Sequence, residues 1–104
     1  MRLLTDELRA KLPPLYSQEA EADPMVYAKF FLQGTGWTWY VTEGSEYGND
    51  FLFFGFVIGL ESEFGYFLLS ELESVRAPLV GLPVERDVSF TEGRLTDVVP
   101  APDI

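Results

Sequence analysis

The chain has 104 residues, of which 47% are hydrophobic and 23% charged, a balance typical of one globular domain. It contains neither cysteine nor histidine, which excludes disulfides, a Ser-His-Asp triad, a Cys-His pair and zinc fingers. The net charge of −10 makes direct binding to nucleic acid or to an anionic membrane unfavourable, because both carry negative charge.

The first predicted element is a short helix that begins after Thr5, a residue type that caps helices. Three leucines at a spacing of four give this helix one apolar stripe: Leu4, Leu8 and Leu12. Pro13 and Pro14 end it, because proline lacks the amide hydrogen and restricts the preceding residue. The acidic stretch 17–24 is expected to be an exposed connection.

Alternation of apolar and polar side chains, with many aromatic and β-branched residues, predicts several strands. The expected strands are 25–32, 37–43, 51–60, 66–69 and 84–90. The expected connections are a loop over 33–36, a polar loop over 44–50 and a turn over 61–65.

The remaining elements complete an α+β domain. Ser70-Glu71-Leu72-Glu73 matches the pattern of a capping box and predicts a second short helix over 71–75. Residues 93–104 contain two prolines and few packing groups, so we expect an extended tail there. The sequence thus predicts a single domain over residues 1–92, an antiparallel meander sheet of four to five strands with two short helices.

The apolar run 51–60 has no polar face. A central strand buried on both sides explains this pattern, and an exposed patch for a partner or a second copy is the alternative. Gly55 and Gly59 share one face of the run, where glycine indicates the close approach of a backbone or ring. We expect Trp37 or Trp39 to pack over them, with a ligand slot as the alternative.

Seven phrases of the chain resemble the bacterial DUF2958 family over residues 3 to 92. They are LPPLY (12–16), DPMVYAKFF (23–31), WTWYVTE (37–43), FFGFVIGLE (53–61), GYF (65–67), SELESVR (70–76) and GLPVERD (81–87). The resemblance implies no defined activity, because the family has none assigned. It implies a small cytoplasmic protein of the kind often carried on plasmids and other mobile elements, with a role in transfer, maintenance or evasion of host defence.

The carboxylates fall into two groups along the chain. Glu43, Glu46 and Asp50 surround the expected polar loop, and Glu61 and Glu63 flank the expected turn. Oxygen clusters of this kind suit Ca²⁺ or Mg²⁺, but the spacing matches no EF-hand. We therefore expect solvated loop charges and no metal or other cofactor.

Arg86 shares its parity with Val84, Val88 and Phe90, so a regular strand would turn it inward. An inward arginine needs a carboxylate partner, because burying an unpaired charge is costly. A buried or edge ion pair is expected, and an anion-binding arginine is the alternative.

Asp6 and Glu7 interrupt the first apolar residues, so no long apolar segment forms near the start of the sequence. We therefore expect no signal peptide. The longest apolar run, 51–60, is shorter than the roughly 20 residues that span a bilayer. The cytoplasm is the expected location.

The absence of a nucleophile-base motif and of a phosphate loop predicts a protein without enzymatic activity. We expect a protein-binding or accessory module that uses an aromatic sheet face and an acidic rim to bind a protein partner. The acidic surface admits a basic partner, and the alternative is that it only keeps the protein in solution. A sharper form is a DNA mimic that inhibits a host defence or DNA-processing protein. The candidate contact residues are Trp39, Tyr40, Glu43, Glu46, Asp50, Glu61, Glu63 and Arg86.

Two alternatives belong to other functional classes. One is a hydrolase-like enzyme built from Glu61, Glu63 and Arg86 with Mg²⁺, which requires that the three side chains converge. The other is a structural module that associates with itself, with a homodimer as its simplest form.

Overall fold

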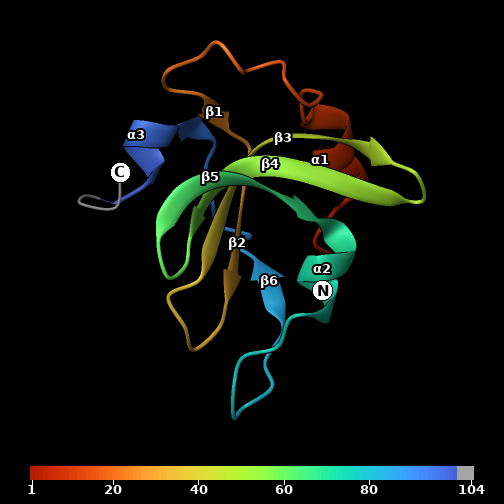
Figure 1. The fold of residues 1–104 in the computed structure, drawn as a ribbon, viewed down its shortest axis with the longest axis vertical. Helices are drawn as coiled ribbons and strands as arrows, with labels where there is room; N and C mark the ends of the chain where they lie inside the picture. The colour runs from red at the N-terminus through yellow and green to blue at the C-terminus, as the bar shows by residue number, and fades with distance from the viewer. Residues whose placement is uncertain (101–104) are drawn as a thin grey trace.

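The computed structural model describes residues 1–100, and its centre is a five-stranded antiparallel sheet (Figure 1). The strands are β2 (Ala28–Leu32), β3 (Thr38–Tyr47), β4 (Asp50–Ile58), β5 (Ser62–Leu68) and β6 (Val84–Arg86). They lie in the order β5-β4-β3-β2-β6, so β2 to β5 form a meander and β6 returns to pair with β2. The predicted α+β fold and antiparallel sheet are confirmed.

A second, two-stranded sheet pairs β1 (Met25–Val26) with β7 (Gly93–Arg94). Three short helices complete the described chain: α1 (Asp6–Lys11), α2 (Leu69–Ser74) and α3 (Leu95–Val98). None of the helices in residues 1–100 is both long and apolar enough to cross a membrane.

The predicted extended tail is wrong for residues 93–99. They form β7 and α3, because Leu95 and Val99 are buried and the Leu95 N–H donates to the Pro24 carbonyl at 2.9 Å. Two well-placed apolar residues suffice to dock the segment, although it has few of them. The rest of the predicted tail, residues 101–104, lies outside the described residues.

The predicted polar loop over 44–50 is also wrong. Strand β3 continues to Tyr47, and a two-residue turn at Gly48-Asn49 leads into β4 at Asp50. Gly48 has φ +62°, a conformation that tight hairpin turns require. The hairpin end carries polar and charged side chains because it extends into solvent.

The predicted strand over 25–32 is divided at Tyr27. Val26 belongs to the small sheet and Ala28 to the large one, and the Tyr27 N–H donates to the Val41 carbonyl at 2.9 Å. Strict alternation predicted that Val26 shares a face with Ala28, Phe30 and Leu32. In the structure Val26 instead belongs to the cluster on the opposite face. The expected turn over 61–65 is mostly strand, because β5 begins at Ser62.

The two predicted helices form, but only one has the predicted cap. The Thr5 hydroxyl accepts a hydrogen bond from the Leu8 N–H at 3.1 Å, as expected. In α2 the cap position is Leu68, whose N–H donates to the Glu71 carboxylate at 2.8 Å. Ser70 lies inside this helix and its hydroxyl donates to Asp50 instead, at 2.5 Å.

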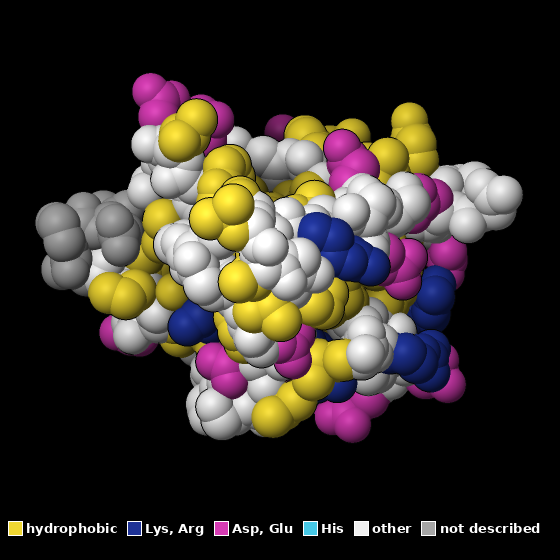
Figure 2. All heavy atoms as spheres, turned by 90° about the horizontal axis from the view of Figure 1, so that it is seen from below, with side chains coloured by type: hydrophobic (Ala, Val, Ile, Leu, Met, Phe, Trp, Pro, Cys, Tyr) yellow, Lys and Arg dark blue, Asp and Glu magenta, His cyan; other side chains and the backbone are white. Residues whose placement is uncertain are grey.

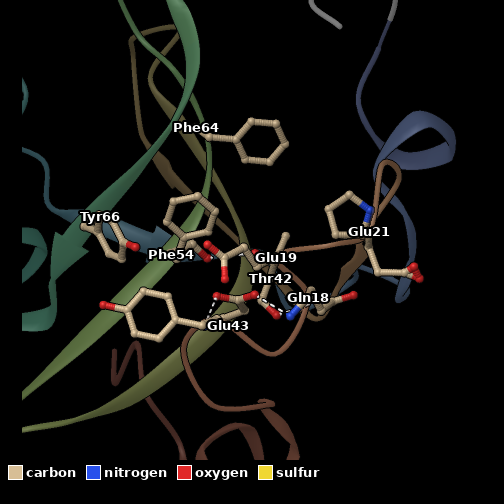
Figure 3. A pocket seen from close by; sticks show the side chains of 10 residues that line it. Gln18, Glu19, Glu21, Thr42, Glu43, Phe54, Phe64 and Tyr66 are labelled. Carbon is tan, nitrogen blue, oxygen red and sulfur yellow. Dashed lines mark hydrogen bonds between the residues drawn. The ribbon is translucent and has the colours of Figure 1, made fainter.

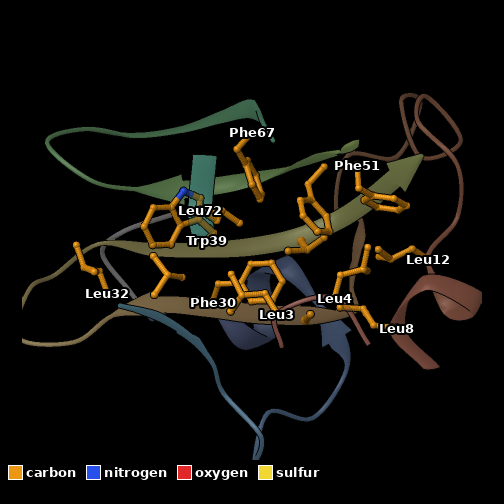
Figure 4. Packing of buried hydrophobic residues seen from close by; sticks show 14 of the residues in the cluster. Leu3, Leu4, Leu8, Leu12, Phe30, Leu32, Trp39, Phe51, Phe67 and Leu72 are labelled. Carbon is orange, nitrogen blue, oxygen red and sulfur yellow. The ribbon is translucent and has the colours of Figure 1, made fainter. Parts of the chain in front are cut away.

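The large sheet carries a hydrophobic cluster on each face, and the second face is only partly covered. The larger cluster lies under the N-terminal segment, α1 and α2 (Figure 4). Its buried members include Leu3, Leu4, Leu8, Leu12, Phe30, Leu32, Trp39, Phe51, Phe53, Phe67 and Leu72. The smaller cluster lies on the opposite face, under α3 and the two-stranded sheet, and contains Val26, Tyr40, Phe56, Leu95 and Val99.

Strand β4 is buried on both sides along part of its length, as a central strand is, and leaves an apolar patch partly exposed along the rest. Phe51 and Phe53 are buried on one face and Phe56 on the other, but Phe54 and Ile58 are only half-buried. Beyond the strand, Leu60 is 95% exposed. The view from below shows hydrophobic side chains on the surface beside acidic ones (Figure 2).

Candidate functional site

A β-bulge in β3 directs Glu43 to the face of the sheet opposite the larger cluster. Val41 pairs with Gly55 and Glu43 pairs with Phe54, so Thr42 is the extra residue. Without the bulge, Glu43 would point to the same side as Trp39 and Val41, into the larger cluster. Bulges commonly re-aim a side chain in this way.

The Glu43 carboxylate is buried, with 3% of the residue exposed. One oxygen accepts a hydrogen bond from the Tyr16 N–H at 2.8 Å, and the other accepts from the Gln18 N–H at 2.7 Å. These charge-assisted bonds hold the chain where Tyr16 adopts φ +74°, an unusual conformation for a residue with a side chain. The prediction of a solvated loop charge is wrong for Glu43.

Gln18 fixes the same segment from the other side. Its side-chain amide donates to the carbonyls of Met25 and Thr42, each at 2.9 Å, and accepts from the Met25 N–H at 2.8 Å. Together with the bonds from Glu43, these contacts attach the acidic connection 17–24 to β1 and β3. The connection therefore forms a fixed wall of a pocket.

This pocket has a volume of about 260 Å³ and lies above Glu43, between the connection 17–24 and strands β4 and β5 (Figure 3). Its lining residues are Tyr16, Gln18, Glu19, Glu21, Pro24, Thr42, Glu43, Phe54, Phe64 and Tyr66. They include four aromatic rings and three carboxylates, but no lysine or arginine. We call this site the acidic aromatic pocket.

The aromatic rings pack on one another. The Phe54 ring is stacked on Phe64 with centroids 5.8 Å apart, and it lies 4.8 Å from the Tyr66 centroid. Tyr16 meets Tyr66 edge to face at 6.5 Å. Phe64 and Tyr66 are still 45% and 53% exposed, so their rings remain available to a ligand.

The electrostatics of the pocket favour a cation. Loss of solvent around Tyr66, its contact with the Tyr16 hydroxyl, and the negative charges of Glu43 and Glu19 together raise the pKa of Tyr66. Aromatic faces attract cations through the ring quadrupole. Among the described residues, no three acidic side chains are grouped to hold a metal ion. The combination of aromatic faces and carboxylates is a lining that an organic cation can contact.

Of the eight residues predicted to form a site, only Glu43 lines the acidic aromatic pocket. Trp39, Glu61 and Glu63 line a second hollow of about 570 Å³ together with Trp37, and this hollow shares Phe64 and Tyr66 of β5 with the first pocket. Trp39 is buried and stacks on Trp37 with centroids 5.9 Å apart. We call this site the tryptophan hollow.

Three of the other predicted residues have structural contacts. Tyr40 is buried in the smaller cluster, with the Lys29 ammonium 5.7 Å from the centre of its ring. Glu46 lies on the exposed end of β3 and bonds to Arg9 of α1. Asp50 accepts hydrogen bonds from Phe51 and Ser70 at the start of β4.

Arg86 differs from its prediction. Strand β6 ends at this residue, and Val88, expected to share its inward face, is 73% exposed. Arg86 is half-buried and its Nε is buried without a hydrogen-bond partner. Within residues 1–100, no carboxylate forms the expected ion pair with it.

Glu61, Glu63 and Arg86 do not converge. Glu63 lies on β5 at one edge of the sheet, and Arg86 lies on β6 at the opposite edge. Arg86 lines a third hollow with Lys11 and Glu92. The hydrolase-like alternative requires the three side chains in one site, and within residues 1–100 they lie at opposite edges of the sheet.

Asp50 ties the start of β4 to α2, and this contact predicts a pH dependence. Its carboxylate accepts from the Ser70 hydroxyl, the Phe51 N–H and the Ser70 N–H, and these bonds lower the pKa of Asp50 below 3.8. A carboxyl whose pKa is lowered on folding stabilises the protein fully above its unfolded pKa, and this contribution disappears as the pH falls through the folded pKa.

We therefore expect Asp50→Asn to be less stable than the wild type at pH 6, and the difference to shrink as the pH falls below 3.8. Urea unfolding curves between pH 6 and the acid limit of folding measure it. Glu73→Gln, an exposed change in α2, is the control. A difference that stays constant with pH would show that the Asp50 contacts do not depend on its charge.

Comparison with known proteins gives one match. A family model described as a protein of unknown function, DUF2958, matches residues 3–99, which confirms the resemblance of the sequence phrases. Neither the curated proteins nor the solved structures contain a match to the chain. The family description carries no activity.

Proposed function

We propose that this chain, which belongs to the DUF2958 family, is a binding module for a basic protein, one of whose cationic side chains enters the acidic aromatic pocket. The observation that supports this most strongly is the composition of the pocket: four aromatic rings and three carboxylates with no cation among its lining residues. A guanidinium or ammonium group is the chemistry that such a lining recognises.

The charge of the whole chain favours the same class of partner. After residue 16 there are fifteen acidic residues against four basic ones. A surface of one sign attracts a partner of the other sign and accelerates its encounter. In its sharper form, the proposal is that this module acts in the cytoplasm as an accessory protein of a mobile element. There it would occupy the basic DNA-binding site of a host defence or DNA-processing protein.

The fixed geometry of the pocket also supports binding. Five hydrogen bonds hold the connection 17–24 in place. The Glu43 carboxylate accepts two of them, from the backbone of Tyr16 and Gln18. The Gln18 side chain makes the other three, two with the backbone of Met25 and one with that of Thr42. A wall that is already ordered loses little conformational entropy when a ligand enters. The exposed carboxylates of Glu19 and Glu21 are free of ion pairs among the described residues.

The test compares two small probes by NMR titration: N-acetyl-arginine amide and N-acetyl-citrulline amide. Citrulline has the shape of arginine but no charge. We expect the arginine probe to shift signals of Phe54, Phe64 and Tyr66, with an affinity at least about fivefold higher than that of citrulline, and to weaken as salt rises. Equal binding of the two probes, or no binding of either, would contradict the proposal.

A pair of double variants locates the site. Glu19→Gln with Glu21→Gln removes two exposed charges from the pocket, and Glu73→Gln with Asp97→Asn removes two exposed charges elsewhere. Because each pair changes the net charge equally, only the first should weaken the arginine probe by more than about twofold at physiological salt. Equal weakening by both pairs would indicate attraction to the whole surface without a pocket.

A further inference from the structure

The outer edge of β5 is an unpaired strand edge. β5 is the first strand of the sheet and pairs only with β4. The Leu68 N–H points away from β4, since it donates to the Glu71 carboxylate. Hydrogen-bonding groups alternate along an antiparallel strand, so the N–H and C=O groups of Ser62, Phe64 and Tyr66 also point outward. Outside the pairing of the strands, none of the backbone hydrogen bonds in residues 1–100 uses these groups.

This edge is protected by one acidic side chain, Glu63, and by neither of the residue types that block a basic segment. Exposed edge strands are commonly shortened or carry lysine or proline. The seven residues of β5 contain neither lysine nor proline, and Gly65 has open space where a side chain would lie. An incoming backbone can therefore approach β5 closely.

The two sites already described meet at β5. Phe64 and Tyr66 line both of them, whereas Glu63, Gly65 and Phe67 line only the tryptophan hollow. Along β5, Phe64 and Tyr66 pair with Phe56 and Phe54, and Glu63 and Phe67 pair with Val57 and Phe53, so the two sets point to opposite faces of the sheet. Successive side chains of an added strand point to opposite faces. One set would lie against Phe64 and Tyr66, and the other would lie beside Glu63 and Glu61.

We propose that the basic segment binds as an extended strand added to the outer edge of β5, with alternate side chains directed to the two hollows. This inference rests on the proposed function and adds how the partner's backbone is held. The free N–H and C=O groups of β5 supply affinity, and the two hollows select the side chains, as in other cases of strand addition. A cationic side chain next to Tyr66 would lie against the Tyr66 ring, at the β5 side of the acidic aromatic pocket.

Charge decides between a basic segment and a second copy of the chain. Glu61 and Glu63 stand at the start of β5 and the chain carries a net charge of −10. Two copies joined at β5 would bring together two chains that each carry a net charge of −10, and like charges at an interface are unfavourable. A basic segment is attracted by the same charges.

The experiment uses three forms of one peptide of seven residues, the length of β5. The parent is an acetylated and amidated peptide of alternating arginine and valine. The other two carry N-methyl groups, on the arginines alone or on the valines alone. Both keep every positive charge, but an N-methyl group on the edge that faces β5 blocks the ladder. Calorimetric titration against the full chain measures all three.

We expect one N-methylated form to bind at least about tenfold more weakly than the parent and the other to stay within about threefold, because only one edge of an added strand faces β5. If both forms bind as well as the parent, strand addition is wrong and the cation pocket stands. If the parent fails to bind while the arginine probe binds, strand addition is likewise wrong. If neither binds, the proposed function itself fails.

Sedimentation of the chain alone tests the second-copy alternative. A monomer, at the concentrations of the titration, is the expected result. A dimer that the parent peptide dissociates would show that β5 is occupied by another copy, and it would overturn the choice of a basic segment.

Discussion

Replacement of Glu43 by alanine is expected to lower the free energy of unfolding by about 3–5 kcal/mol. The carboxylate is buried and accepts the backbone N–H groups of Tyr16 and Gln18. Alanine removes both charge-assisted bonds and leaves two donors without partners, so the connection 17–24 detaches from β3. Urea unfolding followed by tryptophan fluorescence measures the loss.

Two further variants separate the effect of burial from that of charge. Glu46→Ala, three residues along the same strand, removes an exposed carboxylate whose contact is with Arg9. It should cost no more than about 1 kcal/mol. Glu43→Gln keeps the size of the side chain but offers one acceptor oxygen instead of two, so an intermediate loss is expected. Equal stabilities of Glu43→Ala and Glu46→Ala would mean that Glu43 does not anchor the connection.

The position of Glu43 shows why the site was harder to predict than the fold. The aromatic and β-branched residues of 37–43 predicted the strand, but not its full length, because β3 continues through the polar residues to Tyr47. A bulge adds one residue, and at Thr42-Glu43 both residues are polar, so the hydrophobic pattern does not record the change of face. The partners of Glu43 are 25 and 27 residues earlier in the chain, and no local pattern links them.

The aromatic wall of the pocket left a weak signal in the sequence. The even positions of 51–60 are apolar, and they predicted a second face that is either buried or an interface. The structure divides this face: Phe56 is covered by α3 and its neighbours, whereas Phe54 is left beside Phe64 and Tyr66. The division depends on where residues 93–99 dock, and their few apolar residues gave no helical or strand pattern long enough to predict it.

Gly55 is expected to be the least replaceable glycine of the sheet. It pairs directly with Gly65 on the neighbouring strand, yet the two positions differ sharply. A Cβ at Gly55 would lie 1.9 Å from the Tyr40 carbonyl oxygen, whereas a Cβ at Gly65 would have nothing within 4 Å. We therefore expect Gly55→Ala to cost about 3 kcal/mol or more, and Gly65→Ala to change stability by less than about 0.5 kcal/mol.

Gly59→Ala distinguishes a rigid obstacle from a movable one. Its Cβ would lie 2.2 Å from the Trp37 ring, which confirms the predicted aromatic cover at this glycine, whereas Gly55 is covered by backbone. Because Trp37 is 37% exposed, its ring can swing into solvent at a cost of about 1 kcal/mol. Unfolding curves should show the largest loss of unfolding free energy for Gly55→Ala, a smaller loss for Gly59→Ala and the smallest for Gly65→Ala. Tryptophan emission should shift in Gly59→Ala. If Gly55→Ala were as stable as Gly65→Ala, the close approach of β3 and β4 at the bulge would be wrong, and with it the placement of Glu43 in the pocket.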